Sequence, residues 1–567
     1  MNLAGSGGWF KGFLTHFAAV LLASLLFAGS FPNLVVEKGI PLLAWIAYVP
    51  LYWVIHRARV GACAFWGALY GYAAYGLFNY WLSVFHPLAG LIVGIIYLVY
   101  FAVLLPVLKV TLVLFPRRGY VVQWVIWIAY EYLRTQGFLG YSYGIIGYSQ
   151  WTVMPVIQIA AVFGVWGVSA LVVFPSAFLA AALSRFDPAA DWAALVRDFF
   201  RRERIVAVIW LAALAGTLVY GFAASVDYSR ADKANIALIQ HNTDPWLGGL
   251  PQYQLNYRVL KRLSQEALAA DPKPDLVVWS ETAFVPRIYW HTTYRTDPDS
   301  YALVRELLDF LKEQEVPFVL GNDDARKRMS PSGQWEQIDY NAAILYNRGV
   351  ETGIYRKLHL VPFTEGFPYE KQFPWIYQVL RNADTHFWEK GEEATVFDAP
   401  GFKFSTPICF EDTFGYLSRE FVRKGADIIV NLTNDAWSGS LPAQNQHLSM
   451  AVFRAVENRR AMVRSTASGQ TCGIDPNGKV LAMAPPFTEA WLTVEVPIVT
   501  GRISLYTRYG DIWPRLFLLA TGIILLVGIG RGIVGASGTL RNSQKCSVLE
   551  AKPLKLLIKF SNTARGG

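Results

Sequence analysis

The chain has 567 residues, too many for one compact core, and its 53% hydrophobic and 16% charged residues are unusual for a soluble protein. These values indicate a membrane protein. The net charge of +9 does not predict a nucleic-acid partner, because many basic residues lie in short loops between apolar runs rather than on one contiguous face. The four cysteines have no CxxC or Cys/His spacing, so we expect no metal, no cofactor and no disulfide scaffold, whereas one reactive thiol stays possible.

Eight apolar runs are long enough to cross a bilayer core as helices, which takes roughly 20 residues. They cover residues 12–30, 39–56, 60–82, 88–115, 120–135, 157–184, 204–226 and 513–535. We therefore predict a bundle of about eight transmembrane helices. The fourth run is long enough to tilt or break at Pro106, and the fifth is the least typical because Glu131 and Arg134 lie near its end.

The basic residues also predict an orientation, since lysine and arginine collect in cytoplasmic loops. If the N-terminus lies inside, the arginine-rich loops after the second, fourth and sixth runs are all cytoplasmic, and the alternate loops carry almost no basic residues. The long segment between the seventh and eighth runs then lies outside the cytoplasm. We interpret the first run as an anchor rather than a cleaved signal peptide, and residues 537–567 as a basic, disordered cytoplasmic tail.

The segment from about residue 233 to residue 499 has a different pattern. Short β-rich runs such as "ANIALIQ" and "PDLVVWSE" alternate with amphipathic stretches such as "YRVLKRLSQEALAA", which is typical of an α/β domain. We therefore divide the chain into four parts: a membrane domain with seven helices (1–228), the α/β domain (229–503), a last transmembrane helix (504–536) and the tail (537–567).

Three polar residues of the α/β domain stand where predicted strands end. Glu281 ends "DLVVWSE", Lys357 follows "ETGIYR", and Cys409 ends "FKFSTPIC" before a helix-like stretch. Ligand chemistry gathers at the carboxyl ends of strands in α/β sheets, so we expect the three side chains to converge. The helix predicted after Cys409 would favour the thiolate through its N-terminus.

Taken singly, each of these residues has an ordinary explanation. Cys409 would be a buried apolar side chain or a disulfide partner of Cys472, Glu281 an acid at a helix N-terminus, and Lys357 a solvated surface charge. Their joint occurrence, each in an apolar context that normally excludes charge, favours a catalytic set instead.

The motifs "WSETAF", "YRKLHLVPFTEGFP" and "PICFEDTF" resemble the Glu, Lys and Cys motifs of the nitrilase superfamily, and "NLTNDAWSG" resembles the segment that closes the same site. Together with "EYLRTQGFLGYSYGIIGYSQ" and "RYGDIWP" in the membrane parts, the resemblance covers nearly the whole chain and is to the bacterial apolipoprotein N-acyltransferases. It implies a four-layer α-β-β-α sandwich inserted in an all-α membrane bundle. The sequence departs from that family's usual pattern at His241 and Ser280, and "GFLGYS" lacks the usual Pro-Trp.

The resemblance implies a triad of Glu281, Lys357 and Cys409. In this interpretation Glu281 transfers the protons, Cys409 forms a thioester, and Lys357 holds the oxyanion, with the backbone N–H after Cys409 as a candidate second donor. Glu365 and Glu411 are expected to support the triad. The implied substrate or pocket positions are Trp246, Phe410, Asn434 and Trp437, and plain packing stays an alternative for the three aromatic residues.

The implied activity is the last step of lipoprotein maturation. An acyl chain passes from a phosphatidylethanolamine-like phospholipid, through Cys409, to the α-amine of the N-terminal S-diacylglyceryl-cysteine of an apolipoprotein. The implied setting is a monomer in the bacterial inner membrane, with its catalytic domain on the periplasmic face. Two alternatives stay open: a membrane-tethered amidase with the same triad, and a transporter with a degenerate nitrilase-like sensor.

Overall fold

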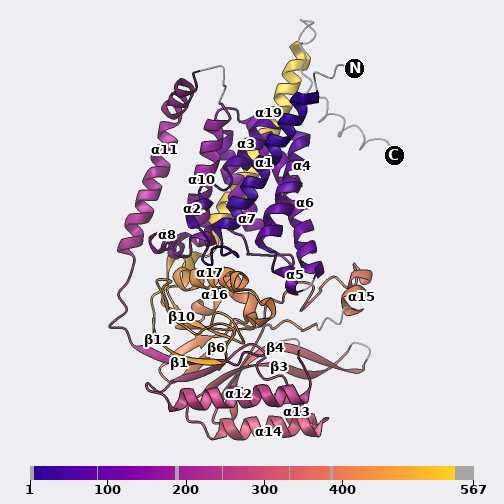
Figure 1. Ribbon diagram of the computed structural model, residues 1–567, viewed down its shortest axis with the longest axis vertical. Helices are drawn as coiled ribbons and strands as arrows, with labels where there is room; N and C mark the ends of the chain where they lie inside the picture. Colours follow the sequence, from indigo (N-terminus) through magenta and orange to yellow (C-terminus); the bar gives the residue numbers. More distant parts are fainter. Residues whose placement is uncertain are drawn as a thin grey trace.

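The computed structural model describes residues 6–85, 87–185, 191–244, 247–330, 333–382 and 387–542. A bundle of helices stands on an α/β sandwich (Figure 1). The first helix, α1 (Ser6–Ser30), begins at the end of the bundle far from the sandwich, and the last helix, α19 (Ile512–Asn542), runs toward that same end. The sandwich therefore lies at the opposite end of the bundle from both of these helix ends.

The helices that precede the first strand all belong to the bundle. They are α1, α2 (Pro41–Ala44), α3 (Val49–Arg57), α4 (Val60–Phe78), α5 (Leu82–Phe85), α6 (Pro87–Leu114), α7 (Gly119–Leu133), the 3₁₀ helix η2 (Ile146–Gln150), α8 (Met154–Ile157), α9 (Ala160–Phe163), α10 (Val165–Leu183) and α11 (Trp192–Ala223). Five helices in the described ranges are long and apolar enough to cross a membrane: Phe10–Ser30, Ala89–Leu114, Val165–Leu183, Ala193–Ala223 and Ile512–Gly530. A polytopic membrane protein is thus supported, and the count of eight spans stays a prediction.

The predicted second span, residues 39–56, is not one continuous helix. It forms α2 and α3, and each of these helices has a proline in its first turn. A proline has no N–H to continue the hydrogen-bond ladder of a preceding turn, so Pro50 starts a new helix instead of extending the old one. In contrast, α6 runs through Pro106 without a break.

Helices α4 and α6 pack unusually closely through two glycines one helical turn apart. A Cβ at Gly67 would lie 2.1 Å from the carbonyl oxygen of Phe101, and a Cβ at Gly71 would lie 2.2 Å from that of Tyr97. Small residues at this spacing let the backbones of membrane helices approach each other. Such close van der Waals packing holds the helices together, because the hydrophobic effect does not drive helices together in lipid.

The sandwich contains two six-stranded sheets packed face to face. The first has the order β12 (Ala490–Pro497), β1 (Lys233–Gln240), β2 (Leu276–Trp279), β3 (Phe318–Met329), β4 (Trp335–Asn347), β5 (Val350–Arg356). The second has the order β11 (Val480–Met483), β10 (Cys472–Ile474), β9 (Ala461–Thr466), β8 (Ile428–Thr433), β7 (Phe402–Ser405), β6 (Val396–Ala399). In each sheet the central strands are parallel and the outer strands antiparallel.

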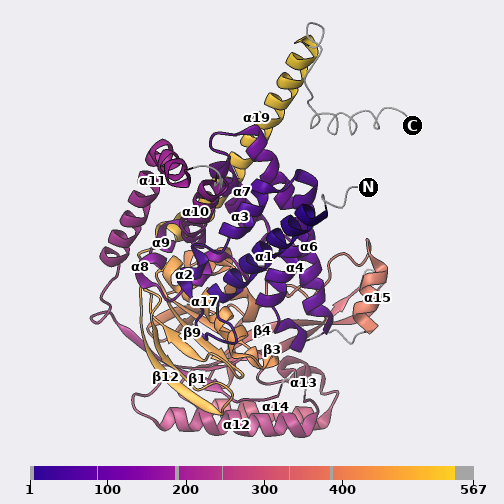
Figure 2. The same ribbon diagram turned by 45° about the horizontal axis from the view of Figure 1, so that its top comes forward.

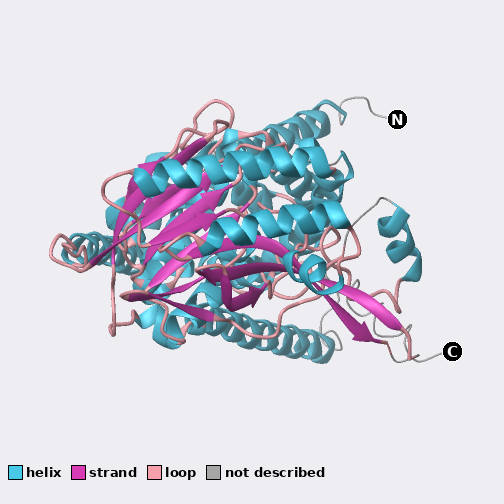
Figure 3. Cartoon of the chain, turned by 90° about the horizontal axis from the view of Figure 1, so that it is seen from below, coloured by secondary structure: helices cyan, strands magenta, loops and turns pink. Residues whose placement is uncertain are grey.

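Helices cover the outer face of each sheet. On the first sheet lie α12 (Leu250–Ala269) and α14 (Pro298–Lys312), which form one apolar core with its strands and are seen from below in Figure 3. On the second sheet lie α16 (Gly415–Arg423) and α17 (Leu441–Asn458), on the side of the bundle. The predicted four-layer α-β-β-α sandwich is confirmed, as are the strands expected from the β-rich runs.

The ends of the helices and strands define the limits of the sandwich and of the last helix. Helix α11 ends at Ala223, the strands extend from Lys233 to Pro497, and the short helix α18 (Leu505–Tyr509) precedes α19. Helix α19 continues to Asn542, so it includes the first residues of the predicted tail. The rest of that tail, 543–567, lies outside the described residues.

Helix α17 joins the two halves of the molecule. It is buried along almost its whole length, polar residues included, because the second sheet lies on one side of it and the bundle on the other. The Gln446 side-chain amide donates to the carbonyl oxygens of Pro32 at 3.0 Å and Phe78 at 3.2 Å, and accepts from Trp81 Nε1 at 2.9 Å. These buried polar groups are satisfied only when the bundle is docked on the sandwich.

Candidate active site

Glu281 lies two residues beyond the end of β2, in a turn that passes directly over β3. A Cβ at Gly321 of β3 would lie 2.7 Å from the Glu281 Cα, so only glycine leaves room for this turn. The carboxylate accepts from Asn341 Nδ2 at 2.8 Å through Oε1 and from the backbone N–H of Asn434 at 3.0 Å through Oε2. Both oxygens are therefore held by donors from different strands and turns.

Lys357 follows β5 and is fully buried. Its Nζ lies 3.2 Å from Glu281 Oε1 and 2.8 Å from Glu365 Oε1. Burial alone would lower the pKa of Lys357, but the charges of Glu365 and Glu281 outweigh burial and raise it well above its usual value. We call Glu281, Lys357 and Glu365 the Lys357 cluster; it has one cation and two carboxylates.

Cys409 is the third predicted triad residue, and it lies beside the Lys357 cluster. It begins the 3₁₀ helix η3 (Cys409–Thr413) with a φ of 50°, a left-handed backbone conformation that is uncommon without glycine. Burial and then the Glu281 carboxylate raise the pKa of the Cys409 thiol well above its usual value, and Lys357 offsets this only in part.

The expectation that a helix N-terminus favours the Cys409 thiolate is wrong, because burial first, and then the Glu281 carboxylate, raise the pKa of the thiol. The alternative of a disulfide with Cys472 is also excluded, since both cysteines are free thiols.

Glu411 ties the Lys357 loop to the Cys409 loop through backbone groups. Its Oε1 accepts from the N–H groups of Leu358 at 2.7 Å and His359 at 2.9 Å, and its Oε2 accepts from that of Ile408 at 2.7 Å. The hydroxyl of Tyr355 donates at 2.8 Å. Burial raises the pKa of Glu411 to about 7, and the backbone N–H donors oppose that rise.

The four predicted pocket positions have different environments. Asn434 orients Glu281 with its backbone N–H, while its side chain accepts from Ala436 N at 3.3 Å at the start of the 3₁₀ helix η4 (Asp435–Ser438). The ring of Phe410 packs edge-on against Phe414, with the centroids 5.0 Å apart. The ring of Trp437 lies 5.6 Å from that of Trp81 of the bundle. Trp246 lies outside the described residues.

Aromatic side chains from the bundle border the loop that follows Lys357. The ring of Phe138 lies 5.2 Å from that of Phe363, 6.0 Å from that of Phe367 and 5.5 Å from that of Tyr369. Further along the same loop, α15 (Pro374–Asn382) has no buried residue and exposes Trp375. Figures 1 and 2 show α15 projecting beside the end of the bundle that meets the sandwich. The site is thus bordered by apolar surface from both halves of the chain.

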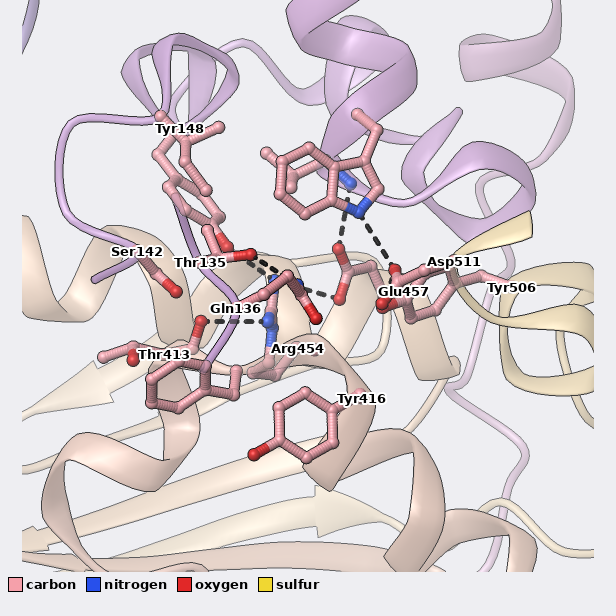
Figure 4. A pocket seen from close by; sticks show the side chains of 15 residues that line it. Thr135, Gln136, Ser142, Tyr148, Thr413, Tyr416, Arg454, Glu457, Tyr506 and Asp511 are labelled. Atoms are coloured by element: carbon pink, nitrogen blue, oxygen red, sulfur yellow. Dashed lines mark hydrogen bonds and ion pairs between the residues drawn. The ribbon is translucent and has the colours of Figure 1, made fainter. Parts of the chain in front are cut away.

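A polar pocket at the junction of bundle and sandwich is separate from the Lys357 cluster (Figure 4). In it, Arg454 of α17 pairs with Glu457 at 2.9 Å and donates to the Tyr148 hydroxyl at 3.0 Å. Glu457 accepts from the N–H of Val165 at 2.9 Å, and Asp511 accepts from Trp166 Nε1 at 2.9 Å. These contacts fasten α17 to η2 and to the start of α10, and they fasten α10 to the residue before α19.

Sequence reasoning missed several side chains that the fold brings to the site. Asn341 of β4 both donates to Glu281 and accepts, through its backbone carbonyl, the N–H of Lys357 at 2.8 Å. Behind the Cys409 and Asn434 turns lies a second charged cluster, which includes His447 and Arg464. Its only sequence signal is the occurrence of charged side chains inside otherwise apolar runs such as "AMVRST".

Comparison with known proteins agrees with this architecture. The family model for the apolipoprotein N-acyltransferase N-terminal domain matches residues 23–178, and that for carbon-nitrogen hydrolase matches residues 235–502. Apolipoprotein N-acyltransferase 1 of Treponema denticola is 45% identical over 91% of this chain and 96% of its own length. The chain belongs to the apolipoprotein N-acyltransferase family.

Apolipoprotein N-acyltransferase 1 of Treponema pallidum is 46% identical, over 92% of this chain and 96% of its own length. A solved carbon-nitrogen hydrolase from Helicobacter pylori G27 is 16% identical, over 47% of this chain and 89% of that one, with a TM-score of 0.34. As a member of the apolipoprotein N-acyltransferases, the chain is a membrane acyltransferase whose sandwich is a nitrilase-superfamily domain. The predicted family and fold are confirmed.

Proposed function

We propose that the chain transfers an acyl chain from a membrane phospholipid to the α-amine of an S-diacylglyceryl-cysteine at the N-terminus of an apolipoprotein. The observation that carries this proposal is the convergence of Glu281, Lys357 and Cys409 from three strand ends in a chain of this family. The two substrates both carry acyl chains that cannot leave a bilayer. An aromatic border shared by bundle and sandwich is what such substrates need.

The first half-reaction starts from a protonated thiol. Glu281 removes the proton of Cys409 as the sulfur attacks the ester carbonyl carbon of the phospholipid. The carbonyl oxygen then becomes an oxyanion. Lys357 has three N–H donors, of which Glu281 and Glu365 accept two in the described part of the chain, so the third is proposed to serve the oxyanion. The ester C–O bond then breaks, Glu281 returns the proton to the leaving lysophospholipid, and Cys409 carries a thioester.

The second half-reaction uses the same groups with an amine in place of the thiol. Glu281 takes a proton from the amine as its nitrogen attacks the thioester carbonyl, and Lys357 again stabilises the oxyanion. The C–S bond breaks, and the proton held by Glu281 goes to the Cys409 sulfur. The products are an N-acylated lipoprotein and the resting thiol.

The remaining residues support this chemistry without reacting. Glu365 accepts from Lys357 Nζ at 2.8 Å and from the backbone N–H of Val361 at 2.9 Å, which fixes the ammonium in place. Glu411 holds the two loops together, as described above. We propose that Phe410 and Trp437 border the acyl chain and that Trp246 belongs to the same pocket.

We also propose that the sandwich lies on the periplasmic face of a bacterial inner membrane. The arginine-rich loops predict this orientation, and α1 begins and α19 ends at the far side of the bundle. Cysteine-accessibility labelling should place residues near Gln334 outside the cytoplasm and those near Arg201 inside. The reverse pattern would contradict the assignment of lipoprotein substrates.

A burst experiment tests the covalent mechanism and separates it from hydrolysis. Purified enzyme mixed with phospholipid alone should release one equivalent of lysophospholipid and then stop, leaving a hydroxylamine-sensitive acyl adduct on Cys409. Continuous release without an amine acceptor would favour a hydrolase. The absence of both burst and adduct would mean that Cys409 is not the nucleophile.

A further inference from the structure

Four charged side chains form a cluster behind the turns that carry Cys409 and Asn434. His447 Nε2 lies 2.6 Å from Asp412 Oδ1, and His447 Nδ1 lies 2.9 Å from Asp435 Oδ1. Arg464 pairs with both carboxylates, at 3.1 Å to Asp435 Oδ2 and in a close contact with Asp412 Oδ2. None of the four is more than 3% exposed. We call Asp412, Asp435, His447 and Arg464 the His447 cluster.

The four residues come from different parts of the sandwich. Asp412 belongs to η3, the turn that begins with Cys409, and Asp435 begins η4, directly after Asn434. Their partners are on the scaffold, since His447 is on the buried helix α17 and Arg464 is in the middle of strand β9. The His447 cluster therefore attaches two site turns to one helix and one strand.

The His447 cluster is linked to Glu281 through the neighbouring residues Asn434 and Asp435. The backbone N–H of Asn434 donates to Glu281 Oε2 at 3.0 Å, and Asp435 is the next residue. Asp435 is held by His447 and Arg464 and also accepts from the Thr433 hydroxyl at 3.1 Å. Any displacement of Asp435 would therefore move the donor that orients Glu281.

The geometry around His447 favours an imidazolium. Nε2 lies 2.6 Å from Asp412 Oδ1 and Nδ1 lies 2.9 Å from Asp435 Oδ1, and both carboxylate oxygens only accept. Arg464 Nη2, which only donates, lies farther from Nδ1, at 3.2 Å, so the shortest contact of each ring nitrogen is one in which it donates. Burial would lower the pKa of His447, but Asp412 and Asp435 raise it to about 9 against the opposing charge of Arg464. With two cations and two carboxylates, the cluster is electrically balanced.

Two further titratable groups face the cluster from neighbouring elements. The ring of Tyr143, from the bundle, lies 6.2 Å from that of His447, and burial raises its pKa well above the usual value. Cys472 of β10 is near Arg464, and burial raises its pKa to about 12. Neither of these groups loses its proton near pH 9, so His447 is the member of this environment that titrates there.

We propose that His447 is a positioning residue for acyl transfer: through Asp435 it fixes the Asn434 N–H that orients Glu281, and through Asp412 it fixes the turn of Cys409. The inference rests on the proposed role of Glu281 as the base. Buried ion pairs contribute little net stability compared with apolar packing, but they define one geometry, which is what a preorganised base requires.

Two substitutions divide the contacts of His447. In His447→Asn the amide nitrogen stays near the position of Nδ1 and keeps the link to Asp435, whereas in His447→Gln it lies near the position of Nε2 and keeps the link to Asp412. We expect His447→Gln to slow acyl-enzyme formation by roughly tenfold to a hundredfold, because Asp435 keeps Arg464 and Thr433 but loses His447, and His447→Asn to slow it less. The KM for phospholipid should change by no more than about twofold in both variants.

The measurement is the single-turnover release of lysophospholipid, with the melting temperature of each variant as a control. A merely structural role would lower both melting temperatures alike and leave the folded enzyme at the normal rate. Normal rates in both folded variants would overturn the inference. Glu281→Gln is the reference: if that variant keeps the normal rate, the proposed function fails whatever the His447 variants do.

The unmutated enzyme offers a second test that does not depend on the folding of variants. The single-turnover rate should fall reversibly as the pH rises through about 9, because His447 then loses the proton that links Asp412 to Asp435. In Asp412→Asn the alkaline fall should begin at lower pH, since one of the two carboxylates that stabilise the imidazolium is gone. A rate that does not change between pH 8 and pH 10 in the unmutated enzyme would contradict the proposal.

Discussion

The Lys357 cluster and the His447 cluster are neighbours built from the same kinds of side chain, yet their charges differ. In the Lys357 cluster one ammonium faces two carboxylates, so a negative charge is left over beside the Cys409 thiol. In the His447 cluster two cations face two carboxylates, and the charges cancel. All members of the two clusters are buried except Glu365, whose side chain is 13% exposed, so water screens the difference in charge only weakly.

The difference in charge determines what each cluster is suited to do. Burial, and then the negative charge of Glu281, raise the pKa of Cys409, so the resting thiol is protonated and needs a base at the moment of attack. The balanced cluster offers no group that gains or loses a proton easily at neutral pH, and it fixes geometry instead. Four substitutions or conditions would break or sharpen this distinction.

Glu281→Gln should have the largest effect, because it keeps the shape of the Lys357 cluster and removes the base. We expect acyl-enzyme formation to fall by roughly 10²-fold to 10⁴-fold, the usual contribution of a positioned general base. Mass spectrometry of the Cys409 adduct after mixing with phospholipid measures it. Cys63→Ala is a matched control, since Cys63 is a free, buried thiol of α4, and it should form the adduct normally. Normal adduct formation in Glu281→Gln would exclude this residue as the base.

Lys357→Ala should reduce the rate by roughly 10²-fold to 10³-fold, as the loss of one oxyanion donor does in other enzymes. Lys357→Arg should not restore activity. The ammonium lies between Glu281 at 3.2 Å and Glu365 at 2.8 Å and is fully buried, so a planar guanidinium has no room there. Initial rates at saturating phospholipid measure both variants, and recovery by arginine would show that any cation suffices.

Glu411→Gln should have a smaller effect, roughly tenfold to a hundredfold, because the amide oxygen still accepts from the backbone of one loop, whereas the amide nitrogen only donates and loses the N–H of the other. The carboxylate accepts from Leu358, His359 and Ile408, so both loops shift slightly. Tyr355→Phe removes only one donor to Glu411 and serves as the milder companion variant. Normal rates in both Glu411→Gln and Tyr355→Phe would show that acyl transfer does not depend on the link between the Lys357 and Cys409 loops.

The pH dependence concerns stability and not the rate. The pKa of His447 is raised from 6.5 to about 9 in the folded protein, so its contribution is complete below pH 6.5 and is lost as the pH rises through 9. The full contribution is on the order of 3 kcal/mol, given about 1.4 kcal/mol for each pKa unit. Melting temperatures in detergent between pH 6 and pH 10 should decrease over this window, and His447→Gln should flatten the decrease.

Much of the architecture follows from local patterns in the sequence. The β-rich runs became strands, and "YRVLKRLSQEALAA" became the amphipathic helix α12, because each pattern buries one face at its own period. The second membrane run is not one helix, since Pro50 cannot continue the hydrogen-bond ladder of a preceding turn and lies in the first turn of α3. The prediction of a Cys409 thiolate is wrong: the chain position indicates a helix N-terminus, whereas the pKa of the thiol depends on burial and on Glu281, a residue far away in sequence.

Residue type, spacing and hydrophobic period in the sequence by itself determined the membrane helices, the α/β domain and the strand-end positions of Glu281, Lys357 and Cys409, and the resemblance of its motifs to a known family implied the four layers. The tertiary structure alone decided which charges meet. Asn341 and Asn434 orient Glu281, and His447 bridges two aspartates, through contacts between residues separated by 12 to 153 positions. No local pattern encodes such contacts: electrostatic energies depend on distances of a few ångströms and on burial, and both are set only when the sheets, α17 and the bundle pack together.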